Sequence, residues 1–519
     1  MTNHAHRGRT RPGRWGAWLV ILLWVGCSAP KRPAYLPPVG IDVRHYDVAL
    51  RLDPEKRRLE GQVTLEVRRT QAATELPLCF GTLVVDSVRV GGRAVAPVRR
   101  GQRLIVPLNG ELQTQVTLAY HGTPSEGLYE ATYLGQRVVF TDSWPYRGCG
   151  WLPAVHHPSD PATLALTLTV PRGYQAAGSG RLVRIDTLDD AVRFRWQLDA
   201  TAPTYSFAFA VADYVRTDSV ADDTIPIHYY LLPSDRDRVY RLRRTPDALH
   251  WLSRWLGPYP YRSYAVVQVP IDYAGMENAS APFLRADLFD MGDVEGVQVH
   301  ELVHQWFGNR VSIAGWRDLW LSEGTATYLT TMFYEVYDGL EAARRQWVDM
   351  ARLTPEALRL HGALVPGRYV DPEAHLTWVP YRKGACVLHL LRLKLGDATF
   401  RRALQTVYRR FAGKPLSTEG FKAVLEEVSG RDLDALFDYW VYGDRLPELR
   451  VYWEAAQRRL TWRVVGDEGT LQDVPFQLAV QQGARVRYVD ARASALQLPE
   501  ATERPEVHPV GILMKVVYP

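Results

Sequence analysis

The chain has 519 residues, of which 46% are hydrophobic, so it can bury sizeable cores and is long enough for about two to four domains. Its formal net charge is +5, but four arginines lie in the first 27 residues, and without that segment the charge falls to about +1. We find no basic stripe of the kind that binds nucleic acid, so we expect no nucleic-acid partner.

Residues 1–27 have the pattern of an export signal. A basic, acid-free start precedes an apolar run over residues 15–25, which is too short for a comfortable membrane span. Residues 25–28, Val-Gly-Cys-Ser, resemble a bacterial lipoprotein cleavage box, although Trp24 stands where leucine is usual. We therefore expect a lipid on Cys27 that anchors an exported protein in the bacterial cell envelope, at the periplasmic or outer surface. Plain secretion and an uncleaved anchor are the alternatives.

Residues 28–40 contain four prolines and are predicted to form a stiff tether. From residue 41 to residue 233, apolar and polar residues alternate with a period of two, which predicts an N-terminal all-β domain over 41–233. Residues 151–160 interrupt this alternation and are predicted to form an ordered loop. His156 and His157 are adjacent there, so their side chains point apart, and we favour a structural role over a metal-binding role.

The pattern changes after residue 233. Helical periodicity dominates from about residue 295 to 442, with Ser417 as an N-cap and Gly430 as a stop signal, and residues 234–446 are predicted to form a mostly helical α+β domain. Alternation then returns, which predicts a small β-sandwich over residues 447–519. The predicted fold class is therefore multidomain α and β.

Three cysteines follow the predicted signal segment: Cys79, Cys149 and Cys386. Their odd number and wide spacing make a disulfide framework unfavourable even in an oxidising compartment, and none has the CxxC spacing of a zinc knuckle. We expect each of them to be a small buried apolar residue.

The chemistry is concentrated around His300, Glu301 and His304. Residues four apart on a helix share one face, so the two imidazoles can bind one Zn²⁺ with the carboxylate of Glu301 beside them. Glu323 follows after 18 intervening residues, enough for a helix to end and a second helix to return a carboxylate to the metal. We predict one zinc ion per chain, bound by His300, His304 and Glu323.

These residues resemble the zinc signature of the gluzincin metallopeptidases, and specifically of the aminopeptidase N family. Residues 305–309, Gln-Trp-Phe-Gly-Asn, match that family's continuation, and the similarity extends from about His45 to Leu449. The resemblance implies a thermolysin-like catalytic domain in residues 234–446. It further implies a bacterial short form that lacks the long C-terminal helical domain of larger members.

Residues 274–278 resemble the family's Gly-x-Met-Glu-Asn strand, with Ala274 in place of the first glycine. In the family, the backbone of this strand pairs with the peptide and its glutamate binds the α-amine. The resemblance assigns substrate binding to Gly275, Met276, Glu277 and Asn278.

Residues 381–384, Tyr-Arg-Lys-Gly, resemble the family's Tyr-x-Lys-Gly segment, so Tyr381 maps onto the tyrosine that stabilises the tetrahedral oxyanion. Glu301 would act as the general base, taking a proton from a zinc-activated water and passing it to the leaving amine. Both residues are therefore predicted to be catalytic.

One stretch departs from the family's pattern. A Thr-Gln-x-Glu or Thr-Gln-x-Gln segment there supplies a second anchor for the free amine, whereas residues 141–145 place Trp144 at that position. Either Asp142 takes over from a shifted position, or amine recognition depends on Glu277 alone.

We predict a zinc metallopeptidase that removes N-terminal residues from peptides with a free N-terminus. The alternatives are a non-catalytic surface binding or scaffold protein that retains the zinc domain, a zinc endopeptidase, and epoxide hydrolysis at the same site. For Trp306, Trp316 and Trp320, helical spacing and apolar neighbours predict core packing rather than a role in the site.

Overall fold

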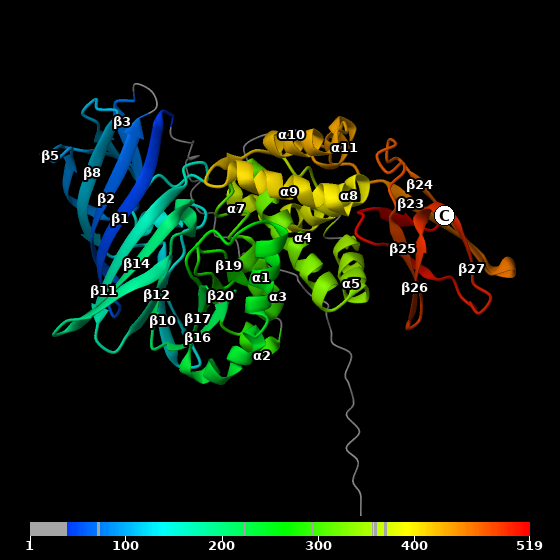
Figure 1. Cartoon of the computed structure of the whole chain (residues 1–519), viewed down its shortest axis with the longest axis horizontal. Helices are drawn as coiled ribbons and strands as arrows, with labels where there is room; N and C mark the ends of the chain where they lie inside the picture. The colour runs from blue at the N-terminus through cyan, green and yellow to red at the C-terminus, as the bar shows by residue number, and fades with distance from the viewer. Residues whose placement is uncertain are drawn as a thin grey trace, which may run out of the picture. The chain divides into compact units, whose positions relative to one another are not determined.

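The structure is a computed structural model. It describes residues 39–69, 73–222, 224–292, 294–354, 357, 361–367 and 371–519. The predicted signal segment and all but the last two residues of the predicted tether lie outside the described residues. In Figure 1, strands dominate the blue to cyan part of the chain, helices the green to yellow part, and strands again the orange to red part. Within the described ranges, no helix is both long and apolar enough to cross a membrane.

The N-terminal part is built on an eight-stranded sheet with the order β13-β14-β11-β1-β2-β8-β4-β5. Its strands are β1 (Ile41–Asp53), β2 (Arg58–Arg69), β4 (Val84–Val90), β5 (Arg93–Ala94), β8 (Gln113–Gly122), β11 (Ala162–Pro171), β13 (Arg181–Thr187) and β14 (Ala191–Ala202). From Tyr46 to Leu52 every second residue of β1 is buried, as expected for a strand with one face on the core. A register shift between Val43 and His45 marks a β-bulge, which moves this alternation by one residue.

Two smaller sheets complete this part of the chain. A four-stranded sheet contains β12 (Gln175–Gly178), β15 (Phe209–Ala212), β10 (Gln136–Thr141) and β9 (Leu128–Tyr133), in that order. A three-stranded sheet contains β3 (Glu75–Cys79), β7 (Arg103–Pro107) and β6 (Val98–Arg100). Two short 3-10 helices, η1 (Arg147–Gly150) and η2 (Thr204–Ser206), lie in the connections. The β-rich N-terminal prediction is confirmed.

The prediction that every cysteine is unpaired was wrong for two of them. Cys79 and Cys149 form a disulfide across 70 residues of sequence, with their Cα atoms 5.1 Å apart. An isolated β-bridge between Cys79 and Ala154 brings the loop that contains Cys149 onto β3, a long-range pairing that cysteine spacing does not reveal. Cys386 is free and buried, as predicted.

The loop over residues 151–160 is ordered and almost entirely buried. His156 Nε2 lies 3.1 Å from the Leu152 carbonyl oxygen, and His157 Nδ1 lies 2.7 Å from Ser159 Oγ. Both rings are therefore used in local hydrogen bonds, which agrees with the structural role favoured for them.

A five-stranded sheet then leads to the site. Its order is β16-β17-β18-β20-β19, with β16 (Val215–Ala221), β17 (Ile225–Leu231), β18 (Tyr264–Val269), β20 (Phe283–Arg285) and β19 (Gly275–Met276). Every residue of β18 is buried, which fits a central strand covered on both faces. β19 pairs with β20 alone and forms the edge of this sheet. The sheet joins strands from both sides of the domain boundary predicted near residue 233, and that boundary stays a prediction.

Helices lie between β17 and β18 of this sheet and again after β20, and they dominate the later part as predicted. They are η3 (Pro233–Leu242), α1 (Thr245–Trp255), α2 (Leu288–Met291), α3 (Val294–Val303), η4 (Trp316–Asp318), α4 (Trp320–Tyr337), α5 (Leu340–Ala351), α7 (Pro372–His375), the π-helical turn η5 (Val379–Lys383), α8 (Gly384–Leu395), α9 (Asp397–Phe411), α10 (Thr418–Ser429) and α11 (Asp434–Trp440). Ser417 Oγ accepts a hydrogen bond from the Gly420 N–H, and Gly430 ends α10 with φ +66°, so both predicted caps of this helix are confirmed. A two-stranded contact joins β21 (Ser312–Ile313) to β22 (Pro415–Leu416).

The C-terminal part consists of two small sheets. The first contains β27 (Ala495–Gln497), β24 (Arg459–Val465), β23 (Glu448–Glu454) and β29 (Lys515–Val517), and the second contains β26 (Arg485–Asp490), β25 (Gln477–Gln482) and β28 (Glu506–Pro509). Short 3-10 helices η6 (Ala455–Gln457) and η7 (Ala491–Ala493) connect the strands. The predicted return to β structure is confirmed.

Candidate active site

The three predicted metal ligands converge between α3 and α4. The Nε2 atoms of His300 and His304 are 3.1 Å apart, and Glu323 Oε2 lies 3.4 Å from the first and 3.3 Å from the second. Zinc bonds of about 2.0–2.1 Å in tetrahedral geometry place the ligand atoms about 3.3–3.5 Å from one another. The three side chains therefore fit one zinc ion.

The environment of His304 orients its ring for metal binding. His304 Nδ1 lies 3.1 Å from the carbonyl oxygen of Phe307 and 3.0 Å from Ser322 Oγ. Because a carbonyl oxygen only accepts hydrogen bonds, Nδ1 carries the proton and the Nε2 lone pair is left for a metal. A Cβ on Gly308, whose φ is +121°, would lie 2.5 Å from Ser322 Oγ and 3.0 Å from His304 Nδ1. Glycine is therefore needed there.

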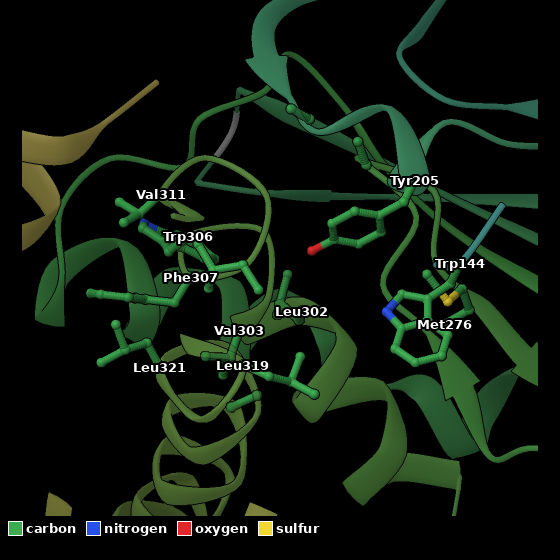
Figure 2. Packing of buried hydrophobic residues seen from close by; sticks show 14 of the residues in the cluster. Trp144, Tyr205, Met276, Leu302, Val303, Trp306, Phe307, Val311, Leu319 and Leu321 are labelled. Carbon is green, nitrogen blue, oxygen red and sulfur yellow. The ribbon is translucent and has the colours of Figure 1, made fainter. Parts of the chain in front are cut away.

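Buried apolar residues support this end of α3. Trp306, Trp316 and Trp320 are all buried, so the core packing predicted for them is confirmed. The Trp306 Nε1–H donates to the carbonyl oxygen of Gly257, and the Trp320 Nε1–H donates to Thr418 Oγ1. Figure 2 shows Trp306 with other buried residues of the segment that follows α3. The ligand-bearing turn is thus held by the core.

Three carboxylates surround His304. Burial disfavours a charged imidazole, but Glu323, Glu277 and Glu301 outweigh it and raise the pKa of His304 to about 10. Burial raises the pKa of Glu301 well above its ordinary value, and the neighbouring Glu277 and Glu323 add to this rise. The site thus gathers carboxyl groups in a buried position, and a bound divalent cation would favour their ionised forms.

Glu301 lies directly against β19. A Cβ on Gly275 would collide with the Glu301 carboxylate, so the glycine keeps space for this side chain. Glu301 is buried, and it lies next to the ligands without being one of the three convergent atoms. This position matches the one predicted for a general base.

The four predicted substrate residues follow one another along this edge. Gly275 and Met276 form β19, and Glu277 and Asn278 come directly after it; the last three are buried. Burial raises the pKa of Glu277 to about 7, with His304 opposing this effect and Glu323 adding to it. Glu277 directly follows β19, whose Gly275 lies against the Glu301 carboxylate, so it lies beside the segment that carries the predicted ligands.

Tyr381, the last of the predicted site residues, lies in η5. Its ring is nearly parallel to that of His300, with centroids 6.1 Å apart and planes 16° from parallel. Burial and then Glu323 raise the pKa of Tyr381 well above its ordinary value, so its hydroxyl keeps the proton. The structure therefore brings a hydrogen-bond donor to the ligand cluster.

Sequence reasoning did not identify the residues that position Tyr381. Lys383 is fully buried, and its Nζ donates to the carbonyl oxygens of Gly362 at 2.8 Å and Gly443 at 3.0 Å. The helices α4 and α8 meet at Gly324 and Gly384, where a Cβ on either glycine would come within 3.0 Å of the other residue's Cα. The Tyr-x-Lys-Gly segment includes both Lys383 and Gly384. The sequence does not indicate, however, that Gly384 packs against Gly324 of another helix.

The stretch that departs from the family's pattern is held in an ion-pair bridge. Asp142 Oδ2 accepts from Arg147 Nη2 at 2.7 Å and Nε at 2.9 Å, while its Oδ1 accepts from the Trp144 N–H at 3.2 Å. Arg147 Nη1 also lies 2.8 Å from Glu373 Oε1. The Trp144 ring packs edge-on against Trp316. Both oxygens of Asp142 are thus engaged by the protein, and Trp144, which the resemblance aligns with the second anchor, packs against Trp316.

The fold and the three-ligand site resemble those of gluzincin-type zinc metallopeptidases. Residues 240–440 match the Peptidase family M1 domain. An M1 zinc metallopeptidase from Deinococcus radiodurans is 29% identical, with a TM-score of 0.70, and the match covers 79% of this chain and 96% of that chain. A mutant of an M1 zinc metallopeptidase from that organism has been solved bound to a Tyr-ser-ala substrate. The chain is thus similar to the M1, aminopeptidase N-like zinc metallopeptidases in sequence and in fold.

Curated relatives are longer. Aminopeptidase M1-D of Oryza sativa subsp. japonica is 26% identical over 447 residues, and the match covers 79% of this chain and 50% of that protein. Probable aminopeptidase 1 of Sulfurisphaera tokodaii is 24% identical over 503 residues, with 90% and 62% covered. This chain therefore spans about half to two thirds of the length of these relatives.

Proposed function

We propose that this protein is a zinc aminopeptidase that hydrolyses the first peptide bond of peptides with a free N-terminus. The observation that carries the proposal is the convergence of two groups on one buried centre. One is the ligand triangle of His300, His304 and Glu323, and the other is the buried Glu277, which follows the strand that lies against Glu301. Such a pair of groups suits a substrate with a carbonyl beside a positive charge.

A zinc ion bound by His300, His304 and Glu323 would polarise the scissile carbonyl and acidify a water molecule. Glu301, whose carboxylate lies against Gly275 of β19, would take up the proton of the attacking water and pass it to the leaving amine. Tyr381, whose hydroxyl keeps its proton, would donate to the oxygen on which negative charge develops.

The substrate would be aligned by β19 and the residues after it. An edge strand has unpaired backbone groups, so a peptide can add to it as a further strand. The α-ammonium would pair with the carboxylate of Glu277. We propose that Glu277 alone recognises the amine, because Asp142 is already engaged by Arg147 and by the Trp144 N–H.

The test uses purified mature protein and two substrates, an aminoacyl anilide with a free amine and its N-acetyl form, each with and without chelator. The expected result is rapid, chelator-sensitive hydrolysis of the free-amine substrate and slow hydrolysis of the blocked one. Zinc added back should restore the rate. Equal rates on the two substrates would favour a zinc endopeptidase. Absence of chelator-sensitive hydrolysis on both, with zinc bound, would favour the non-catalytic binding or scaffold protein.

We also propose that the protein is exported and carries a lipid on Cys27. The support is the basic and apolar pattern of residues 1–27 together with the disulfide between Cys79 and Cys149, because disulfides persist in oxidising compartments. In cells that process lipoproteins, the mature protein should partition with membranes and begin with an acylated cysteine by mass spectrometry. A Cys27→Ala variant that still carries the acyl mass would contradict the assignment.

A further inference from the structure

Two buried amide side chains lie just after α3, and neither has a part in the chemistry above. Gln305 and Asn309 are both fully buried. The Asn309 Nδ2–H donates to the carbonyl oxygen of Glu277 at 2.6 Å, and Gln305 Oε1 accepts from the Ser280 N–H at 2.7 Å. The two amides therefore hold both ends of the turn 277–280, and we call them the amide clamp.

The turn held by the amide clamp is conformationally unusual. Ser280 has φ +58°, in the left-handed region that residues other than glycine rarely adopt. Its Oγ accepts from the Gly180 N–H at 2.8 Å, and its carbonyl oxygen accepts from the Ala265 N–H at 2.7 Å. The turn is thus held by hydrogen bonds from other parts of the chain. Those made by the amide clamp come from the segment that carries the metal ligands.

The other side of the amide clamp is attached to the catalytic helix. The Gln305 Nε2–H donates to the carbonyl oxygen of Glu301 at 2.9 Å, and the Asn309 N–H donates to the carbonyl oxygen of His304 at 3.0 Å. The orientation of the Asn309 amide is determined, because exchanging its N and O would place two acceptors against each other at Glu277. Two residues thereby connect the backbone of the proposed base and of a metal ligand to that of the amine anchor.

We propose that Gln305 and Asn309 are positioning residues that fix the distance between the Glu277 carboxylate and the metal centre. That distance determines which peptide bond reaches the ligands when the α-ammonium is bound. The inference rests on the proposed aminopeptidase function and extends it to residues that touch neither metal nor substrate. Catalysis is sensitive to such placement, and a misplacement of about 1 Å from a remote change can cost roughly 100-fold in rate.

The test compares Asn309→Ala with a matched control. Gln298 is also a buried amide on α3, but its Nε2–H makes only a long bond of 3.4 Å to the Tyr264 hydroxyl, so Gln298→Leu serves as the control. For each variant, zinc content, kcat and KM are measured on the free-amine anilide, and the rate is measured on its N-acetyl form.

For Asn309→Ala the expected result is a bound zinc, a KM raised roughly 10- to 100-fold, and a smaller change in kcat. The preference for the free-amine substrate should fall by a similar factor, because the N-acetyl substrate does not use Glu277. Gln298→Leu should keep both the KM and the preference. A lower proportion of folded protein would reduce kcat alone. The KM and the substrate preference therefore distinguish a positioning role from a general loss of folded protein.

Gln305→Met tests the same clamp from its other residue, and it carries the experiment if Asn309→Ala is not recovered as folded protein. An unchanged KM and an unchanged substrate preference in these variants would overturn the inference while leaving the aminopeptidase function in place. A wild-type protein with no chelator-sensitive hydrolysis would instead overturn the function on which the inference rests.

Discussion

The metal-binding half of the site is local in sequence. His300 and His304 belong to one helix and its first following turn, and Glu323 lies in the first turn of the helix that comes next. The three ligand atoms meet because one helix–loop–helix unit folds back on itself. Contacts that support them, such as the one between His304 and Ser322, come from the same unit.

The half of the site that contains Glu277, the proposed amine-binding group, and its surroundings is assembled from segments that are distant in sequence. Glu277 follows an edge strand, and the ion pair between Arg147 and Glu373 joins residues separated by 226 positions. Asp142 lies at the end of β10, where the same arginine engages it. The comparison teaches that one short unit can supply all three predicted metal ligands, whereas the contacts around Asp142 join segments that are distant in sequence.

The largest expected effect comes from the metal half. Glu301→Gln keeps the shape of the side chain but removes the group that accepts the proton. We expect kcat to fall by about 10²- to 10⁴-fold, with zinc content and the free-amine preference unchanged. Steady-state kinetics and metal analysis check this. If the variant kept near wild-type turnover, another residue would have to be the base.

Tyr381→Phe should have the next largest effect. Loss of one oxyanion donor costs about 10²- to 10³-fold in kcat elsewhere, while binding of the ground state is little affected. We therefore expect the KM to stay within about threefold of the wild-type value. Equal losses on free-amine and N-acetyl substrates would place Tyr381 in the metal half. A loss confined to the free-amine substrate would place it in the amine half.

Glu277→Gln should separate the halves most clearly. Removing a charge-assisted bond to the α-ammonium should lower kcat/KM roughly 10- to 100-fold on the free-amine substrate and leave the N-acetyl rate unchanged. The ratio of the two rates is the measurement. A parallel fall on both substrates would mean that Glu277 supports the metal centre rather than the amine.

Asp142→Asn should have the smallest effect. Both oxygens of Asp142 are already engaged, so we expect the free-amine preference to change by less than about threefold. Thermal unfolding checks that the variant is folded, because Arg147 loses a charged partner. A loss comparable to that of Glu277→Gln would revive the view that Asp142 is the second anchor.

The contrast between local and long-range contacts explains which features could be predicted from the sequence and which could not. Period-two alternation, the caps of α10 and the spacing from His300 to Glu323 are local patterns, and the structure bears them out. The disulfide of Cys79 and Cys149 was missed because a pairing between distant segments creates it. The hydrogen-bond partners of Asp142 could not be predicted for a similar reason, because the sequence does not indicate that the Arg147 side chain reaches it.

The most direct test of the central claim is the order in which an unmodified peptide is degraded. A peptide of about ten residues is incubated with zinc-loaded protein, and the products are followed by mass spectrometry over time. We predict the loss of single residues from the N-terminus, with the C-terminus intact and with full protection when the N-terminus is acetylated. Cleavage at internal bonds, or equal degradation of the acetylated peptide, would contradict the account.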